Sequence, residues 1–167
     1  KKPILINELK LVINAIDQSN QKEKRKIRDK AIILVGFSGG FRRSELVNFE
    51  YDDVEFVNEG VKIFIKRSKT DQSGEGMTKA IPYFDNKLYC PVISLKNWIN
   101  NTKTLSGKVF DISDKSVSLI IKKYTSLSGL DPNKYGGHSL RSGFATSTAE
   151  SGAEERNIMA MTGHKTT

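Results

Sequence analysis

The spacing of apolar residues changes from helical to strand-like near residue 54 and back to helical near residue 91. In the first part, apolar residues over about Ile6–Gln18 recur three or four positions apart, as they do on one face of an amphipathic helix. From Val54 they alternate with polar residues, which is the period of a β-strand. This order of periods predicts a mainly α (α+β) fold in which one small sheet lies between helices.

A charged segment precedes the most apolar run of the chain. Residues 22–30 carry six basic and two acidic side chains, and the apolar run Ala31–Phe37 follows directly. We interpret the two as one helix with a solvated, charge-paired first half and a buried second half. Gly39 and Gly40 then end this helix, because glycine commonly occupies the position just past a helix C-terminus.

Three segments between residues 54 and 83 have the composition of short strands. Val54–Val57 and the alternating run Val61–Ile65 are joined by residues 58–60, Asn-Glu-Gly, which are typical of a tight turn. A polar loop, Ser68–Met77, leads to a third candidate strand, Thr78–Tyr83. We therefore expect a small three-stranded antiparallel sheet.

Helical spacing of the apolar residues returns in the last part of the chain. The four segments are Val92 to Ile99 after Pro91, Val117 to Leu127, Leu140 to Thr148, and a short one with Ile158 and Met161 before Gly163. A length of 167 residues suits one domain, and the composition marks no internal linker. We therefore expect residues 1–167 to form a single domain.

The net charge narrows the class of partner. Lysine and arginine number 27 against 19 aspartates and glutamates, which gives a net charge of +8. This balance favours a polyanion, and nucleic acid before an anionic membrane, because no basic amphipathic helix with an aromatic face is present. No apolar run reaches the length of a bilayer span. Charge alone does not separate a DNA-processing enzyme from a passive binder.

Cysteine and histidine are scarce. Cys90 is the only cysteine, which excludes an intrachain disulfide framework and a cysteine-based metal cluster. With His138 and His164 as the only histidines, a histidine-rich zinc site is not expected. We expect chemistry without a protein-held metal or cofactor, in a reducing intracellular compartment.

The segment 137–143 contains His138 and Arg141, three positions apart at the start of a predicted helix. Residues at this spacing share a helix face, while Leu140 points elsewhere. A histidine and an arginine beside the unpaired N–H groups of a helix start can bind a phosphate or a carboxylate. The alternative is a surface arginine next to a histidine that caps the helix.

A second group of charges follows the glycine pair. Arg42 and Arg43 open a new helix, and Glu45 lies three positions after Arg42. We expect at least one of the two guanidiniums to point into a cleft, and Glu45 is spaced to hold that of Arg42 by a charge-assisted hydrogen bond. The alternative is ordinary charge pairing at an exposed helix start.

Further candidates lie in the hairpin loop and near the end of the chain. The segment 66–71 includes Lys66, Arg67 and Lys69. A loop lysine can give a proton to a departing oxygen when neighbouring cations lower its pKa. His164 follows the glycine that ends the last predicted helix. Solvated loop lysines and a helix-capping histidine are the alternatives.

In this order, the four groups resemble the catalytic domain of the tyrosine recombinase (phage integrase) family. The matching segments are residues 3–9 at the domain entry, residues 40–46 as the first arginine box, Lys69 as the hairpin lysine, His138–Arg141 as the second box and Gly163-His164 as the third. They extend over nearly the whole chain, and the last two boxes are the most specific. The resemblance implies double-stranded DNA as the partner and no cofactor.

The resemblance also implies roles for five catalytic residues. Arg42 and Arg141 would bind the non-bridging oxygens of one DNA phosphodiester. Lys69 would be the general acid for the leaving 5′ oxygen. His138 would act as a general acid/base or phosphate donor, and His164 would donate a further hydrogen bond to the phosphate.

Other residues would support this set. Glu45 would orient the part of the site formed by Arg42 and His138, and Arg43, Lys66 and Arg67 would contact DNA. Lys66 and Lys79 remain alternatives to the predicted loop lysine, because the loop length varies within the family.

The family nucleophile is a tyrosine roughly two to three helical turns past the third box, and it has no counterpart in residues 1–167. All five tyrosines precede that point, and Tyr135 lies on the wrong side of the second box. We therefore expect a fragment without the nucleophile segment and without the family's N-terminal DNA-binding domain, which forms no covalent DNA adduct by itself.

The full-length parent is expected to be a site-specific recombinase or integrase that cleaves and rejoins DNA strands through a 3′-phosphotyrosyl intermediate. It would assemble with copies of itself on DNA, without a membrane, in the cytoplasm at the nucleoid, and would be encoded by a bacterium, a phage or another mobile element. The sequence does not reveal the DNA target or the direction of the reaction.

Three other functions remain open. A type IB topoisomerase uses similar chemistry, although it is expected to place a lysine where this chain has His138. A non-catalytic DNA-binding module would use the arginines only as phosphate anchors. A metal-independent ribonuclease would use both histidines and Lys69.

Overall fold

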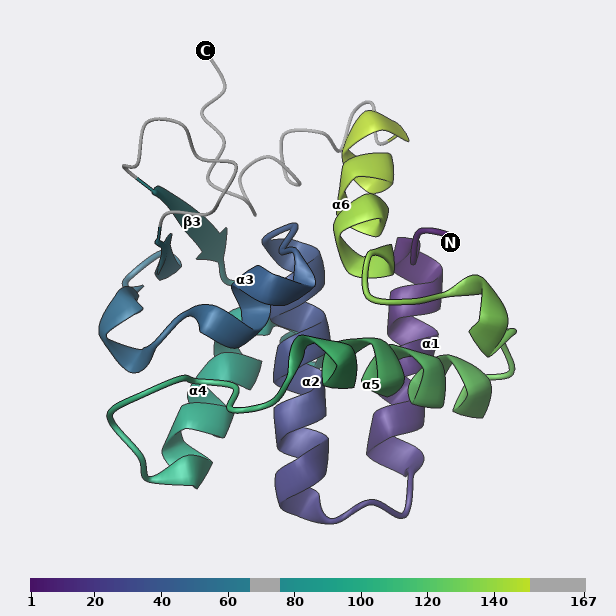
Figure 1. The fold of residues 1–167 in the computed structure, drawn as a ribbon, viewed down its shortest axis with the longest axis horizontal. Helices are drawn as coiled ribbons and strands as arrows, with labels where there is room; N and C mark the ends of the chain where they lie inside the picture. Colours follow the sequence, from purple (N-terminus) through teal and green to yellow (C-terminus); the bar gives the residue numbers. More distant parts are fainter. Residues whose placement is uncertain (67–75, 151–167) are drawn as a thin grey trace.

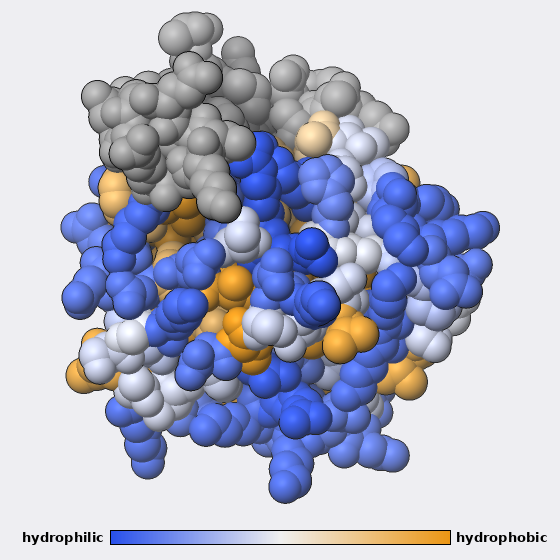
Figure 2. Space-filling view, in the orientation of Figure 1, coloured by the Kyte–Doolittle hydropathy of each residue, from blue (hydrophilic) through white to orange (hydrophobic). Residues whose placement is uncertain are grey.

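The computed structural model describes residues 1–66 and 76–150, which form six α-helices and one three-stranded antiparallel sheet (Figure 1). The sheet lies to one side of the helices, and in the sequence it falls between helical segments, as the change of hydrophobic period predicts (Figure 1). The face shown in Figure 2 is mainly hydrophilic, with scattered apolar residues. None of the described helices combines the length and the apolar character that crossing a bilayer requires.

The first two helices build the centre of the core. α1 (Ile6–Gln18) has the predicted bounds, and the apolar residues of its predicted face are buried except for Ile6, which is 37% exposed at the first position of the helix. α2 (Glu23–Ser38) has a charged first half and a buried second half, as predicted. It packs against α1, α4 and α6, so it is the helix around which the others are arranged (Figure 1).

One part of the prediction for α2 is wrong. Its charged half is not solvated throughout, because Asp29 is only 1% exposed. The Tyr124 hydroxyl donates to Asp29 Oδ2 at 2.5 Å, and the Arg28 guanidinium lies 3.0 Å from Oδ1. Tyr124 belongs to α5, which packs against this side of α2 and shields the carboxylate from water.

The sheet has the predicted composition and topology. β1 (Val54–Val57), β2 (Gly60–Ile65) and β3 (Met77–Pro82) pair antiparallel in chain order, with Val57 opposite Gly60 and Val61 opposite Ile81. Val61, Ile63 and Ile65 face the core, while Lys62 and Phe64 are exposed. β3 begins and ends one residue earlier than predicted.

Four more helices complete the fold. They are α3 (Arg43–Asn48), α4 (Pro91–Thr102), α5 (Asp114–Leu127) and α6 (Ser139–Glu150). Single 3₁₀ turns lie at Tyr51–Asp53, Lys87–Tyr89 and Pro132–Lys134. Leu127, which belongs to the apolar pattern that predicted α5, is 56% exposed because it occupies the last position of the helix. The predicted short helix around Ile158 and Met161 lies outside the described residues.

The first residues of the chain lie against the segment that leads into α6. The Lys2 N–H donates to the Lys134 carbonyl oxygen at 2.6 Å, and the Ile4 N–H donates to the Ser139 carbonyl oxygen at 3.0 Å. Ile4 is fully buried. Residues far apart in the sequence are therefore joined at the N-terminus of α6 (Figure 1).

Further contacts join α6 and the segment before it to the N-terminal part of the chain. The Tyr135 hydroxyl donates to Glu8 Oε2 at 2.6 Å, and Glu8 Oε1 accepts the Leu5 N–H at 3.0 Å. A Cβ atom on Gly143 would lie 2.0 Å from the Ile4 carbonyl oxygen, so only glycine fits there. α6 is thus pressed directly onto the main chain near Ile4.

Candidate functional site

The centre of the candidate site is the glycine turn at the end of α2. Gly40 has a φ of +60°, a left-handed conformation that glycine adopts without strain. The Phe41 N–H donates to the Gly36 carbonyl oxygen at 2.9 Å, and the Phe41 side chain is fully buried. The carbonyl oxygens of Gly39 and Gly40 accept hydrogen bonds from side chains of other elements.

Arg141 reaches this turn from α6. Its Nη1 group donates to the Gly40 carbonyl oxygen at 2.8 Å. The side chain is still 36% exposed, so part of the guanidinium faces solvent. The second arginine box therefore meets the start of the first one, although 101 positions separate the two residues.

Glu45 lies in the first turn of α3 and is nearly buried, with 8% of its side chain exposed. Its Oε1 atom accepts the Arg42 backbone N–H at 2.8 Å. The same oxygen lies 3.9 Å from Lys79 Nζ and 4.0 Å from Arg141 Nη1. The predicted hydrogen bond from the Arg42 guanidinium to Glu45 is therefore wrong: the carboxylate instead caps α3 through the backbone, since a residue three positions into a helix can reach back to that N–H.

Lys79 approaches the turn from β3. Its ammonium donates to the carbonyl oxygens of Gly39 at 2.7 Å and Gly40 at 3.3 Å, and lies 4.9 Å from the centre of the Phe41 ring. Burial is the main reason why the pKa of Lys79 is lowered; the Glu45 carboxylate opposes this shift, and the guanidiniums of Arg141 and Arg42 add to it. Lys79 was predicted only as an alternative to the loop lysine, although its place two positions before Ile81, on the same face of a strand, indicates an inward side chain.

The two arginines that start α3 are both exposed. The Arg42 charge, like that of Arg141, helps to lower the pKa of the Lys79 ammonium. The aliphatic part of Arg43 packs on the backbone of Gly137, where a Cβ atom would lie 2.0 Å from Arg43 Cδ. Arg43 therefore lies beside the second box.

His138 is exposed and directly precedes α6. Lys79 of β3 and Arg141 of the second box lie within 4.0 Å of the Glu45 carboxylate, and the exposed residues Arg42 and Arg43 stand at the start of the helix that carries Glu45. We call Arg42, Arg43, Lys79, Arg141 and Glu45 the cationic cluster, and His138 adjoins it at the start of α6. A cationic cluster that is partly open to solvent suits a bound anion with several oxygens, such as a phosphate.

The hairpin lysines are only partly described. Lys66 is exposed and its ammonium lies 2.7 Å from Glu50 Oε1 and 3.6 Å from Asp53 Oδ2. The hydrogen bond to Glu50 raises the pKa of Lys66, which makes it a poorer proton donor. Lys66 and Glu45 line the same hollow, of about 210 Å³, so Lys66 lies near the cluster. The predicted residues Arg67, Lys69 and His164 lie outside the described residues.

The sequence profile of the phage integrase family matches residues 5–167 of this chain. The chain belongs to the phage integrase family. A xerD homologue of Selenomonas ruminantium, named an integrase/recombinase, is 43% identical to this chain over 99% of the chain and 51% of that protein. A tyrosine recombinase of Agathobacter rectalis is 31% identical over 88% of this chain and 47% of its own length. The chain spans about half the length of these curated relatives.

Solved structures with the same fold include a recombinase and an integrase, each bound to its DNA site. The XerH site-specific recombinase bound to its difH substrate matches with a TM-score of 0.74 and 18% identity, over 99% of this chain and 48% of that one. A lambda integrase dimer bound to a COC′ core site matches with a TM-score of 0.62 and 16% identity, over 99% of this chain and 45% of that one. The predicted fold class is therefore confirmed.

The tyrosines of this integrase-family chain are engaged elsewhere in the fold. Each of the five hydroxyl groups makes a hydrogen bond to another side chain; the residues are Tyr51, Tyr83, Tyr89, Tyr124 and Tyr135. Burial and the hydrogen bond to Glu8 raise the pKa of Tyr135 to about 12, which disfavours the phenolate that a nucleophile needs. The placement of Tyr135 thus agrees with its exclusion as the nucleophile.

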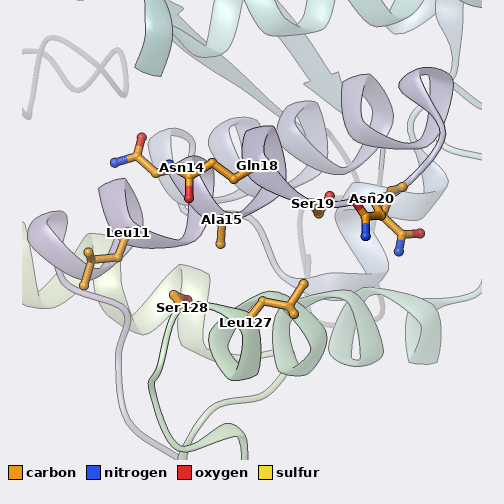
Figure 3. A pocket seen from close by; sticks show the side chains of 9 residues that line it. Leu11, Asn14, Ala15, Gln18, Ser19, Asn20, Leu127 and Ser128 are labelled. Carbon is orange, nitrogen blue, oxygen red and sulfur yellow. The ribbon is translucent and has the colours of Figure 1, made fainter.

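Two other features carry no part of the site. In the described ranges, no three His, Cys, Asp or Glu side chains are grouped as a metal site requires. A pocket of about 710 Å³ lies between α1 and the end of α5, with Leu11 and Leu127 on opposite walls (Figure 3). Its lining residues belong to none of the family boxes, so this pocket is separate from the cationic cluster.

Proposed function

We propose that this chain is the catalytic part of a tyrosine recombinase that binds double-stranded DNA and holds one backbone phosphate between Arg42 and Arg141. The observation that carries the proposal is the meeting of the two arginine boxes at the Gly40 carbonyl and Glu45. Family membership supports the same reaction class, since the relatives described above are named recombinases or integrases.

The chemistry follows from where charge develops. Attack on a phosphodiester places negative charge on the non-bridging oxygens, and guanidiniums that are already oriented stabilise this charge. A covalent protein–DNA phosphoester conserves the energy of the broken bond, so the strand can be rejoined without ATP. We assign the phosphate contacts to Arg42 and Arg141, with His138 and His164 as further donors.

The leaving 5′ oxygen needs a proton, and we assign this role to Lys69. Lys69 follows Lys66 closely in the sequence, and Lys66 lies near the cationic cluster but is itself neutralised by two carboxylates. We place the nucleophilic tyrosine outside residues 1–167, because all five hydroxyls within them are engaged in the fold. Arg43, Lys66 and Arg67 are proposed to contact the DNA backbone around the reacting phosphate.

We also propose double-stranded DNA as the partner and the bacterial cytoplasm as the place where the protein acts. The net charge of +8 and the cationic cluster favour DNA, and both solved structures cited above contain it. Self-assembly on DNA is proposed by analogy with the lambda integrase dimer. The protein would then act where its DNA lies, in the cytoplasm of a bacterial cell. The presence of His138 in the second box favours a recombinase over a topoisomerase.

The test uses the natural full-length protein with Arg42→Ala, Arg141→Ala and a matched control, Arg25→Ala. Arg25 is an exposed arginine near the start of α2, about 20 Å along the helix from the glycine turn. The assays are covalent complex formation on nicked suicide DNA and DNA affinity by fluorescence anisotropy.

For Arg42→Ala and Arg141→Ala we expect cleavage to fall about 100- to 1000-fold, with a much smaller loss of affinity. Arg25→Ala should cleave as the wild type does. A loss of affinity without any specific loss of cleavage would instead identify a passive DNA-binding module, and the proposal would be wrong.

A further inference from the structure

Lys79 is a buried cation whose hydrogen bonds are all directed into the protein. Its side chain is 9% exposed, and its ammonium donates to the carbonyl oxygens of Gly39 and Gly40. Glu45 Oε1 lies 3.9 Å from the ammonium, which is an ion-pair distance and too long for a hydrogen bond. Two of the three N–H donors are thus held by main-chain oxygens, and the side chain is almost closed off from solvent. This geometry argues against Lys79 as a general acid and calls for another role.

One carboxylate oxygen links Lys79 to the proposed phosphate site. Glu45 Oε1 accepts the Arg42 N–H at 2.8 Å and lies about equally far from Lys79 Nζ, at 3.9 Å, and Arg141 Nη1, at 4.0 Å. Two cations thus share one buried negative charge. Within the described residues, removal of the Lys79 ammonium would leave Arg141 as the one cation within 4.0 Å of that carboxylate.

The consequence for Arg141 follows from electrostatics. The attraction between charges at this distance is strong in a buried environment and weak in water. An unshared Glu45 carboxylate would draw the Arg141 guanidinium inward, where it cannot serve a phosphate. Loss of the ammonium would also release the Gly39 and Gly40 carbonyl oxygens, and Gly40 is the residue on which Arg141 rests.

We propose that Lys79 is a positioning residue, which shares the charge of Glu45 and fixes the Gly39–Gly40 turn so that the Arg141 guanidinium remains available to the DNA phosphate. The proposal rests on the function proposed above. It differs from a purely structural role, because it makes the effect of Lys79 depend on the charge of Glu45.

The test compares Lys79→Met, Lys79→Arg and the double variant Lys79→Met/Glu45→Gln in the natural full-length protein. Glutamine keeps an oxygen for the Arg42 N–H but removes the negative charge. Lys62→Met is the matched control, since Lys62 is an exposed lysine on the neighbouring strand β2. The measurements are the cleavage rate at saturating suicide DNA, DNA affinity and the melting temperature.

We expect Lys79→Met to slow cleavage about 10- to 100-fold, the range typical of residues that orient a contacting group, with DNA affinity nearly unchanged. Lys79→Arg should retain most of the rate because it keeps the charge. Glu45→Gln in the Lys79→Met background should restore much of the loss, and Lys62→Met should match the wild type. A double variant that cleaves no faster than Lys79→Met, at equal melting temperature, would overturn the proposal.

A second measurement does not require cleavage, and it can still be made if one of the Lys79 variants fails to fold. The guanidinium ¹⁵N–¹H signals of Arg141 report how tightly that group is held, and they can be recorded for Lys79→Gln as well as Lys79→Met. We expect slower exchange of these protons with water in either variant, reversed by Glu45→Gln. Unchanged signals would refute the positioning role, whereas a wild-type protein that binds but does not cleave DNA would refute the proposed function alone.

Discussion

Substitution of Gly40 by alanine tests whether the glycine turn holds the two arginine boxes together. Gly40 has a φ of +60°, and an added Cβ atom would lie 2.7 Å from Phe144 Cδ2, with two further ring atoms at 3.3 Å. Phe144 belongs to α6, one helical turn after Arg141. The new methyl group would therefore push α6 away from the carbonyl oxygen to which Arg141 donates.

A matched control separates backbone strain from this steric effect. Gly129 also has a positive φ, +84°, but no atom lies within 4 Å of its added Cβ. Each alanine in the left-handed region costs about 1 kcal/mol, partly offset by the smaller entropy of the unfolded chain. The contact with Phe144 adds about 1–3 kcal/mol to the cost of Gly40→Ala alone.

The two variants should thus differ in thermal stability and in cleavage. For a chain of this size, the additional cost lowers the melting temperature of Gly40→Ala by about 2–12 °C relative to Gly129→Ala. Displacement of Arg141 by about 1 Å is expected to slow cleavage roughly 100-fold, while Gly129→Ala cleaves as the wild type does. Equal melting temperatures and equal cleavage rates would show that the Phe144 ring yields freely, and the reasoning about the turn would be refuted.

Two other predictions concern a hydrogen bond and the charged surface. Tyr135→Phe removes the hydroxyl that donates to Glu8 and should lower the free energy of unfolding by about 1.5–3 kcal/mol near neutral pH. The pKa of Tyr135 is raised to about 12 in the folded protein, so above about pH 10 the unfolded chain loses this proton first. The difference in free energy of unfolding between Tyr135→Phe and the wild type should therefore shrink as the pH rises above about 10. Denaturant titrations that show a constant difference would contradict this. DNA affinity should fall steeply between about 50 and 200 mM salt, and Arg42→Ala should reduce the slope by about one; an affinity that does not respond to salt would mean that the basic surface does not engage phosphates.

The elements of the fold follow from local patterns in the sequence. The helix Ile6–Gln18 and the strand Val54–Val57 have the predicted bounds, because an amphipathic period and a tight turn are properties of neighbouring residues. Asp29 and Leu127 show where local patterns fail. Each was placed by its own helix, but its exposure is decided by whether another helix covers it.

The candidate site is predicted less completely, for a similar reason. The arginines, His138 and Glu45 are recognisable from their spacing, and the structure brings the described members together. The predicted hydrogen-bond partner of Glu45 was wrong, because a pattern of side chains does not show which backbone N–H groups lack a partner. The central acceptors are likewise main-chain oxygens of Gly39 and Gly40, and the residues that donate to them, Lys79 and Arg141, lie up to 101 positions away.

The seating of α6 on the start of the chain has a mechanical consequence. Gly143 rests on the Ile4 main chain, and the ring of the next residue, Phe144, lies against Gly40. A rotation or a translation of α6 would therefore break at least one of these two contacts. The position of the Arg141 guanidinium thus depends on the packing of Ile4, and a displacement of the residues just before α1 would also displace that guanidinium.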